Sequence, residues 1–135
     1  MDDLNSYAAY YLEKLKGDDW DAAYHSLIDA DHAVIPILID AYRTEAEPTV
    51  RATLVEIIWQ HRVPETLLFL WEALHDNHPE VWKNALDGFV ALGDASAIQI
   101  LESAKQEIQG TSGARAVRQD WIEEAIQQIR NGSLA

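Results

Sequence analysis

One stretch of this chain occurs again 31 residues earlier, and this repetition restricts the folds that the chain can adopt. Residues 79–93 begin with a proline, carry apolar residues at helical spacing and end with a glycine, as an amphipathic helix with defined ends does. The matched positions of the two copies are Pro48 and Pro79, Val50 and Val81, Val55 and Leu86, and Ile58 and Phe89. The chain is therefore built from a repeated helical unit.

Each repeated helix follows another amphipathic segment, so the repeat unit contains two helices. Residues 38–42, 70–74 and 100–104 resemble one another and precede the copies of the second helix. A later copy lies around residues 117–125, after an insertion of five residues, and a weaker early copy lies around residues 20–28. A period in the low thirties with two helices per unit is typical of a helical solenoid.

The repeated helix also resembles a known family. Pro-Thr-Val-Arg at 48–51 and Pro-Glu-Val-Trp at 79–82 are similar to the start of the second helix in HEAT repeats, in the short bacterial form of phycobilisome lyases. The resemblance covers residues 33–108 best. It implies an all-α fold, a right-handed α-α superhelix of about four helix pairs, in one domain over residues 1–135. Trp82 stands where that motif usually has a basic residue, which argues against the usual polar contact between repeats there.

Eight helices are expected, each with a stripe of apolar residues for the core. Asp31, Asp94 and either Asp18 or Asp19 precede three of them at positions where a carboxylate caps a helix. The spacing places Tyr7, Leu68 and Trp71 among the buried residues. The predicted helices cover residues 2–16, 20–28, 32–44, 48–61, 64–76, 79–92, 95–108 and 113–131.

The charge of the chain limits its partners. The formal net charge is −13, and the acidic residues are concentrated in residues 1–47. Such a field repels phosphate backbones and anionic lipids, so we expect no nucleic acid and no membrane as a partner. It favours a basic protein, although an acidic surface also serves solubility alone. The chain has no cysteine, and no basic-then-apolar segment opens it, so we expect a cytoplasmic protein without a signal peptide.

No pattern of residues indicates catalysis or a bound cofactor. His75 and His78 have a spacing found in metal sites, but a polar turn explains them better because no further ligand is evident. The acids at 18–21 suit a helix start without a cation. The glycine-bearing loop at 110–115 follows a helix and lacks the lysine of a P-loop, so an inserted loop is the better interpretation. We therefore predict no enzyme activity, no catalytic residues, no metal and no cofactor.

The second helices supply the candidate binding surface. In HEAT-like stacks they line the concave wall, and the repeat register aligns Glu56 with Asp87 and Glu123, and Thr53 with Asn84 and Asp120. The register thus predicts an acidic ladder, with an ordinary solvated face as the alternative. Trp20 and Trp82 occupy equivalent edges of the apolar stripe, and either is a core residue or an exposed anchor for a partner. The candidate residues for protein binding are Glu56, Trp82, Lys83, Asn84, Asp87, Asp120 and Glu123.

These observations favour a non-enzymatic protein-binding module. The most concrete hypothesis is a small acidic bacterial inhibitor or immunity protein, which neutralises a basic toxin through its concave surface and is a monomer or weak dimer. Two alternatives stay open. One is an accessory protein like the phycobilisome lyases, which depends on the resemblance alone, and the other is a general HEAT-repeat scaffold or adaptor.

Overall fold

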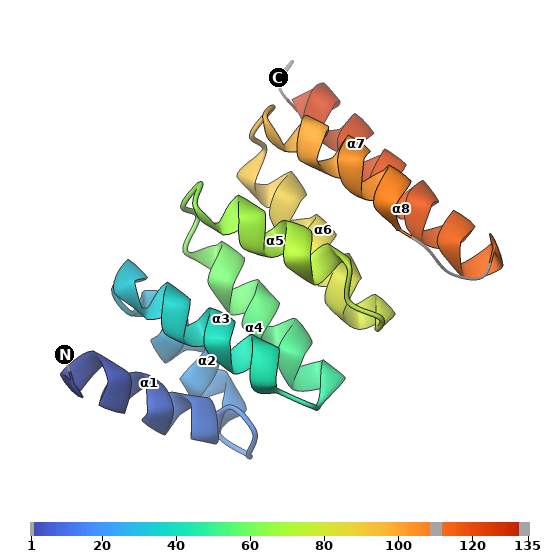
Figure 1. Cartoon of the computed structure of the whole chain (residues 1–135). Helices are drawn as coiled ribbons and strands as arrows, with labels where there is room; N and C mark the ends of the chain where they lie inside the picture. The colour runs from blue at the N-terminus through green and yellow to red at the C-terminus, as the bar shows by residue number, and fades with distance from the viewer. Residues whose placement is uncertain (1, 109–111, 133–135) are drawn as a thin grey trace. The chain divides into compact units, whose positions relative to one another are not determined.

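In a computed structural model the chain is helical throughout the residues that the structure describes, which are 2–108 and 112–132 (Figure 1). No strand occurs within those residues. The predicted all-α class and the arrangement of helices in pairs are confirmed. The helices are α1 (Asp2–Lys14), α2 (Trp20–Asp29), the 3₁₀ helix η1 (His32–Val34), α3 (Ile35–Thr44), α4 (Pro48–Gln60), α5 (Thr66–Leu74), α6 (Pro79–Leu92), α7 (Ala97–Glu107) and α8 (Ser112–Gly132).

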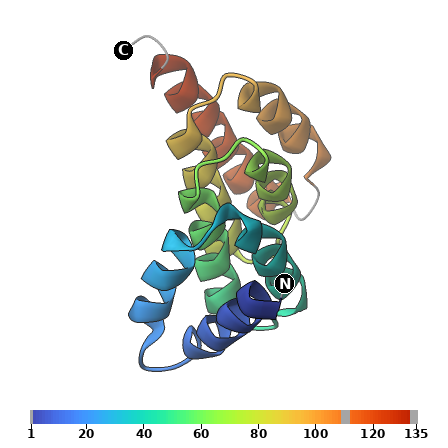
Figure 2. The same ribbon diagram turned by 90° about the vertical axis from the view of Figure 1, so that its left-hand side faces the viewer.

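The chain forms two compact units, residues 1–63 (unit 1) and residues 64–135 (unit 2). Unit 1 contains two helix pairs, because α1 packs on α2 and α3 packs on α4 (Figure 2). The first helices of the pairs, α1 and α3, also contact each other, as do the second helices, α2 and α4. The interior is made of side chains that are almost fully buried, including Ala8, Ala23, Leu27, Val34, Leu38, Leu54, Val55 and Ile58.

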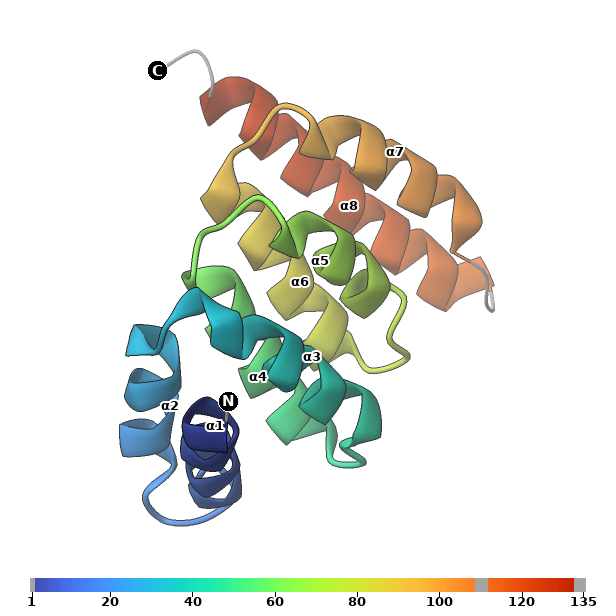
Figure 3. The same cartoon turned by 60° about the vertical axis from the view of Figure 1, so that its left-hand side comes forward.

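Unit 2 repeats this arrangement with its own two pairs. α5 packs on α6 and α7 packs on α8, and the contacts α5 with α7 and α6 with α8 join the pairs (Figure 3). Each helix therefore covers its apolar stripe with its pair partner on one side and the equivalent helix of the neighbouring pair on another. The buried side chains include Leu70, Leu74, Val81, Ala85, Leu86, Phe89, Leu101, Ala104, Ile122 and Ile126. The prediction of a single repeat domain concerns how the two units combine and stays a prediction.

The ends of α6 are those that its sequence predicts. Pro79 lies in the first turn, where its missing N–H costs no helical hydrogen bond. Gly93 has a left-handed backbone with φ 61° and ψ 20°, and its N–H donates to the carbonyl of Phe89 at 3.1 Å. A side chain at this position would be strained, so glycine is required to end the helix there.

The three predicted caps have different outcomes. Asp31 Oδ1 accepts a hydrogen bond from the Ala33 N–H at 2.8 Å at the start of η1, which confirms that cap. Asp94 Oδ1 accepts from the Ser96 N–H at 2.9 Å and from the Ser96 hydroxyl at 2.8 Å, in the turn that leads into α7. Asp19 makes no cap hydrogen bond. Its φ of −93° and ψ of 26° differ from the extended backbone that lets a capping carboxylate reach the first turn.

Three residues predicted to be buried are exposed. Leu68 is 75% exposed because it points away from the buried side of α5, which carries Leu67 and Leu70. Trp71 and Tyr7 lie at the edges of their stripes, where each is hydrogen-bonded through its polar atom. Trp71 Nε1 donates to Glu107 Oε1 at 3.2 Å, and the Tyr7 hydroxyl donates to the Ser26 carbonyl at 3.1 Å. An apolar body with a polar tip is stable at such an edge.

The repeat packing predicts a large loss of stability when a central side chain of α6 is removed. Phe89 and Leu86 are buried against neighbouring helices of unit 2. Phe89→Ala should lower the free energy of unfolding by about 3–5 kcal/mol and Leu86→Ala by about 2–5 kcal/mol, because each leaves a cavity. Urea unfolding measures this. Leu68→Ala is the matched control and should change stability by less than about 0.5 kcal/mol; equal losses in all three variants would contradict the packing.

Candidate protein-binding surfaces

Trp82 lies inside unit 2, where α6 packs against α8. Its side chain is only 3% exposed. The Arg118 guanidinium lies 5.0 Å from the centre of the Trp82 ring, and the Trp121 ring meets it edge-on at 6.1 Å. The interpretation of Trp82 as an exposed anchor is therefore wrong, because two side chains of α8 cover it. Arg118 also donates to the Leu74 carbonyl at 3.2 Å, so it links three helices of the unit.

Trp121, and not Trp82, is the exposed tryptophan at this contact between α6 and α8. Its side chain is 44% exposed, and the Lys83 ammonium lies 4.5 Å from the centre of its ring. A shallow hollow of about 250 Å³ lies beside the ring and is lined by Asp120, Trp121 and Glu124. An aromatic side chain in contact with a cation and flanked by carboxylates thus forms one face of α6 and α8. We call this face the Trp121 surface.

The repeat register explains why Trp121 is exposed. It stands 36 residues after Ala85, which α8 helps to bury within unit 2. Val117 likewise corresponds to buried Val81, and Val117 is exposed. Among the described residues, Val117 and Trp121 lie on a side of α8 that no further helix covers.

The comparison with known families agrees with this geometry. The family described as HEAT repeats matches residues 35–127, which is more than half of the chain. The chain belongs to the HEAT-repeat family. Proteins built from HEAT repeats generally act as protein-interaction scaffolds, and the family is typically non-catalytic. No match was found among curated proteins or among solved structures.

The residues of unit 2 that were predicted to bind a protein have different surroundings. Asp87 and Asp120 are exposed, and Lys83 and Asn84 are half-buried. Glu123 instead joins α8 to α7, because its Oε1 lies 2.7 Å from Lys105 Nζ. Hydrogen bonding from Lys105 lowers the pKa of Glu123, and the same bond raises the pKa of Lys105. Glu123 is thus held in an ion pair within the unit, whereas Asp87 belongs to the α6 face that carries Lys83.

The second-helix surface of unit 1 carries Glu56. The Tyr24 hydroxyl of α2 donates a hydrogen bond to Glu56 Oε2 of α4. Burial, together with this bond to Glu56, raises the pKa of Tyr24 to about 12. Trp20 is 51% exposed and meets Tyr24 edge-on, so the anchor interpretation fits Trp20 and not Trp82. The predicted acidic ladder aligns Glu56 of unit 1 with Asp87 and Glu123 of unit 2. Because it involves both units, it stays a prediction.

A second hollow lies next to Trp20, in unit 1. It measures about 390 Å³ and lies between the turn after α1 and the start of α4. Thr53, the register equivalent of Asn84 and Asp120, lines it. The other lining residues are Leu15, Lys16, Gly17, Trp20, Glu47, Thr49 and Val50. The second-helix face of each unit therefore combines an exposed tryptophan with a shallow hollow.

The histidines considered for a metal site have other partners. His75 Nδ1 lies 2.8 Å from the Trp71 carbonyl and its Nε2 lies 3.3 Å from Glu107, so it links α5 to α7. His78 Nδ1 lies 3.5 Å from Asp76. No group of three potential metal ligands occurs among the described residues. Residues 109–111 of the glycine-bearing loop lie outside those residues. No helix that the structure describes has the length and apolar character to cross a membrane.

A contact between buried His61 and exposed His32 in unit 1 was not predicted from the sequence. His61, at the end of α4, is almost fully buried, and its Nε2 lies 3.0 Å from the Leu27 carbonyl. Because that carbonyl only accepts, His61 carries its proton on Nε2 and its Nδ1 accepts. His32 Nδ1 lies 2.9 Å from this acceptor and therefore donates to it. Twenty-nine residues separate the two histidines, and no motif marks them as a pair.

The histidine pair predicts that unit 1 loses stability in mild acid. Burial lowers the pKa of His61 from its ordinary value of 6.5. The unfolded chain then binds more protons below that value, so the contribution of His61 is complete above it and falls as the pH falls through 6.5. Urea unfolding at about pH 7.5 and about pH 5.5 should show a smaller pH dependence for His61→Gln than for the wild type. His25→Gln, at an exposed histidine of α2, should retain the dependence of the wild type; an unchanged dependence in His61→Gln would contradict this assignment.

Proposed function

We propose that this HEAT-repeat chain binds a basic protein through the Trp121 surface of unit 2. The observation that supports this proposal is the position of Trp121, whose large ring is 44% exposed beside Asp120 and Glu124. Tryptophan is among the residues that contribute most to binding energy at protein interfaces. A ring held in place by Lys83 loses little side-chain entropy on binding, so more of its contact energy is retained.

The charge of the chain supports a basic partner. The formal net charge is −13, and Asp87, Asp120 and Glu124 are exposed carboxylates on α6 and α8. Such a field attracts a basic protein over several ångströms and orients it during the encounter. Trp121 then supplies apolar contact area beside these carboxylates. The carboxylates supply specificity for positive charge.

The most specific form of the proposal is an inhibitor, such as an immunity protein that neutralises a basic toxin. An inhibitor differs from an adaptor in its effect on the partner. The purified partner should lose its activity in proportion to the amount of this chain added, up to saturation. Retained activity in the saturated complex would instead favour an adaptor. Capture of a pigment-carrying protein would favour an accessory protein like the phycobilisome lyases.

Removing the Trp121 ring should weaken the complex mainly by faster dissociation. We expect Trp121→Ala to cost about 2 kcal/mol or more in binding, which is roughly a thirtyfold rise in Kd. The partner is first captured from the native host, and the kinetics are then measured on the purified complex. Leu68→Ala removes an exposed apolar side chain from α5 and should leave Kd unchanged. Equal Kd values for Trp121→Ala and wild type would remove Trp121 from the interface.

Reversing the acidic charges of the Trp121 surface should slow association. Asp87→Lys combined with Asp120→Lys opposes the attraction of a basic partner, and the effect should shrink as salt screens it beyond a distance of about 8–10 Å. The matched control is Asp18→Lys with Asp21→Lys, which changes the net charge equally in unit 1. If the two double variants slow association equally at every salt concentration, net charge and not the Trp121 surface controls the encounter.

A further inference from the structure

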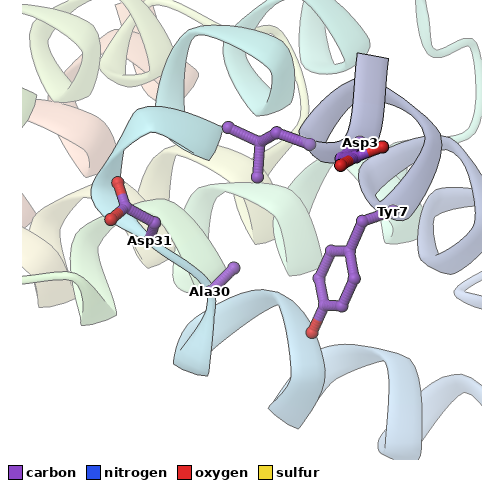
Figure 4. Close-up of a pocket in the computed structure, with 5 residues that line it drawn as sticks. Asp3, Tyr7, Ala30 and Asp31 are labelled. Atoms are coloured by element: carbon purple, nitrogen blue, oxygen red, sulfur yellow. The ribbon is translucent and has the colours of Figure 1, made fainter. Parts of the chain in front are cut away.

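A hollow in unit 1 has apolar walls and carboxylates on its rim (Figure 4). It measures about 420 Å³ and is lined by Asp3, Leu4 and Tyr7 of α1 and by Ala30 and Asp31 from the segment after α2. In Figure 4 Asp31 lies on one side of the hollow and Asp3 and Tyr7 lie on the other, with Ala30 between them. This site is separate from the hollows beside Trp20 and Trp121.

The apolar walls are positioned by regular structure. Asp3 and Tyr7 are four residues apart and Leu4 and Tyr7 are three apart, so the helix places all three on one side of α1. The Tyr7 hydroxyl donates to the Ser26 carbonyl of α2 at 3.1 Å, which fixes the ring as a wall between the two helices. Tyr7 is 39% exposed, so one part of its ring is open to a ligand.

The carboxylates of the rim have capacity for a cation. Asp31 Oδ1 accepts one hydrogen bond from the Ala33 N–H at 2.8 Å, and an ionised carboxylate has about four acceptor positions. Asp3 is exposed. Neither carboxylate pairs with a lysine or an arginine in the part of the chain that the structure describes. The surrounding sequence is the most acidic part of the chain, with eleven acids and three bases in residues 1–47.

We propose that this hollow receives a lysine or arginine side chain from a cationic segment of a partner protein. The methylene stem of such a side chain packs on Leu4, Tyr7 and Ala30, while its charged head reaches Asp3 or Asp31. The Tyr7 ring adds a cation–π attraction when the head group passes over it. A purely apolar side chain would bring the rim carboxylates out of water without a partner, and an anion would be repelled. The charge and the shape of the hollow together select an amphipathic cation.

The length of the aliphatic stem gives the first test. A short capped peptide of glycines with one central lysine is titrated into the full chain and followed by backbone NMR. The same peptide with 2,4-diaminobutyrate in place of lysine keeps the ammonium but has a shorter stem. The lysine peptide should bind about threefold or more tightly, because each buried methylene contributes about 0.8 kcal/mol at most. The largest shifts should occur at Leu4, Tyr7 and Ala30. Equal affinities would overturn the proposed role of the apolar walls.

Charge-matched variants give the second test. Asp3→Asn with Asp31→Asn removes both carboxylates, and asparagine at position 31 still caps the helix start. This variant should bind the lysine peptide about fivefold more weakly, consistent with the loss of a charge-assisted contact. Asp18→Asn with Asp21→Asn makes the same change in net charge elsewhere in unit 1 and should alter binding less than about twofold. Equal weakening in the two variants would show attraction by net charge alone and would overturn the proposal.

Two further readouts separate the alternatives. Asp3→Asn alone leaves the Asp31 cap intact, so its weaker binding cannot result from loss of the fold; unchanged binding would remove Asp3 from the site. Peptide-induced shifts confined to Trp121 and its neighbours would overturn the unit 1 site while leaving the proposed function intact. Conversely, the Trp121→Ala variant should bind the lysine peptide in unit 1 as the wild type does, so the two proposals fail independently.

Discussion

The structure depends on one constraint, which is that a single amphipathic helix of this chain cannot bury its apolar stripe alone. The stripes are wide, and in α6 they include Val81, Trp82, Ala85, Leu86 and Phe89, all of which are buried. α6 achieves this by contacting both α5 and α8. Pairing within a repeat and stacking between repeats are therefore two parts of the same burial, and the charged residues are left on the remaining faces of the helices.

Trp82 and Trp121 show how this constraint shapes the surface that we propose for binding. Between the two repeats of unit 2, Trp82 of α6 is covered by Arg118 and Trp121 of α8, so aromatic and guanidinium groups take the place of the usual polar contact. These contacts hold Trp121 at the surface, with Lys83 over its ring. The buried tryptophan thus supports the exposed one. Trp82 therefore helps to fix the position of Trp121.

Unit 1 contains two features that connect packing with charge. His61 joins α4 to α2 and to η1 through its two ring nitrogens, and burial lowers its pKa and so favours a neutral imidazole. Directly before η1, Asp31 caps the helix and also stands on the rim of the hollow between α1 and the segment after α2. The segment from Ala30 to Val34 is therefore shared by a cap, a contact with buried His61 and a candidate site for a cationic side chain.

The sequence by itself determined the local structure of this protein. The proline at 79 and the glycine at 93 fixed the ends of α6, and the spacing of apolar residues placed Leu86 and Phe89 in the core, because these features depend only on neighbouring residues along one helix. The class of fold and the HEAT repeat followed from their repetition. The tertiary structure decided which stripe-edge residues are covered. Trp82 is buried because side chains of α8 cover it, whereas Trp121 lies on a side of α8 that no other described helix covers, and sequence spacing does not record that difference. It also brought His32 into contact with His61 and placed Asp3 and Asp31 on opposite sides of one hollow, although the members of each pair are distant along the chain.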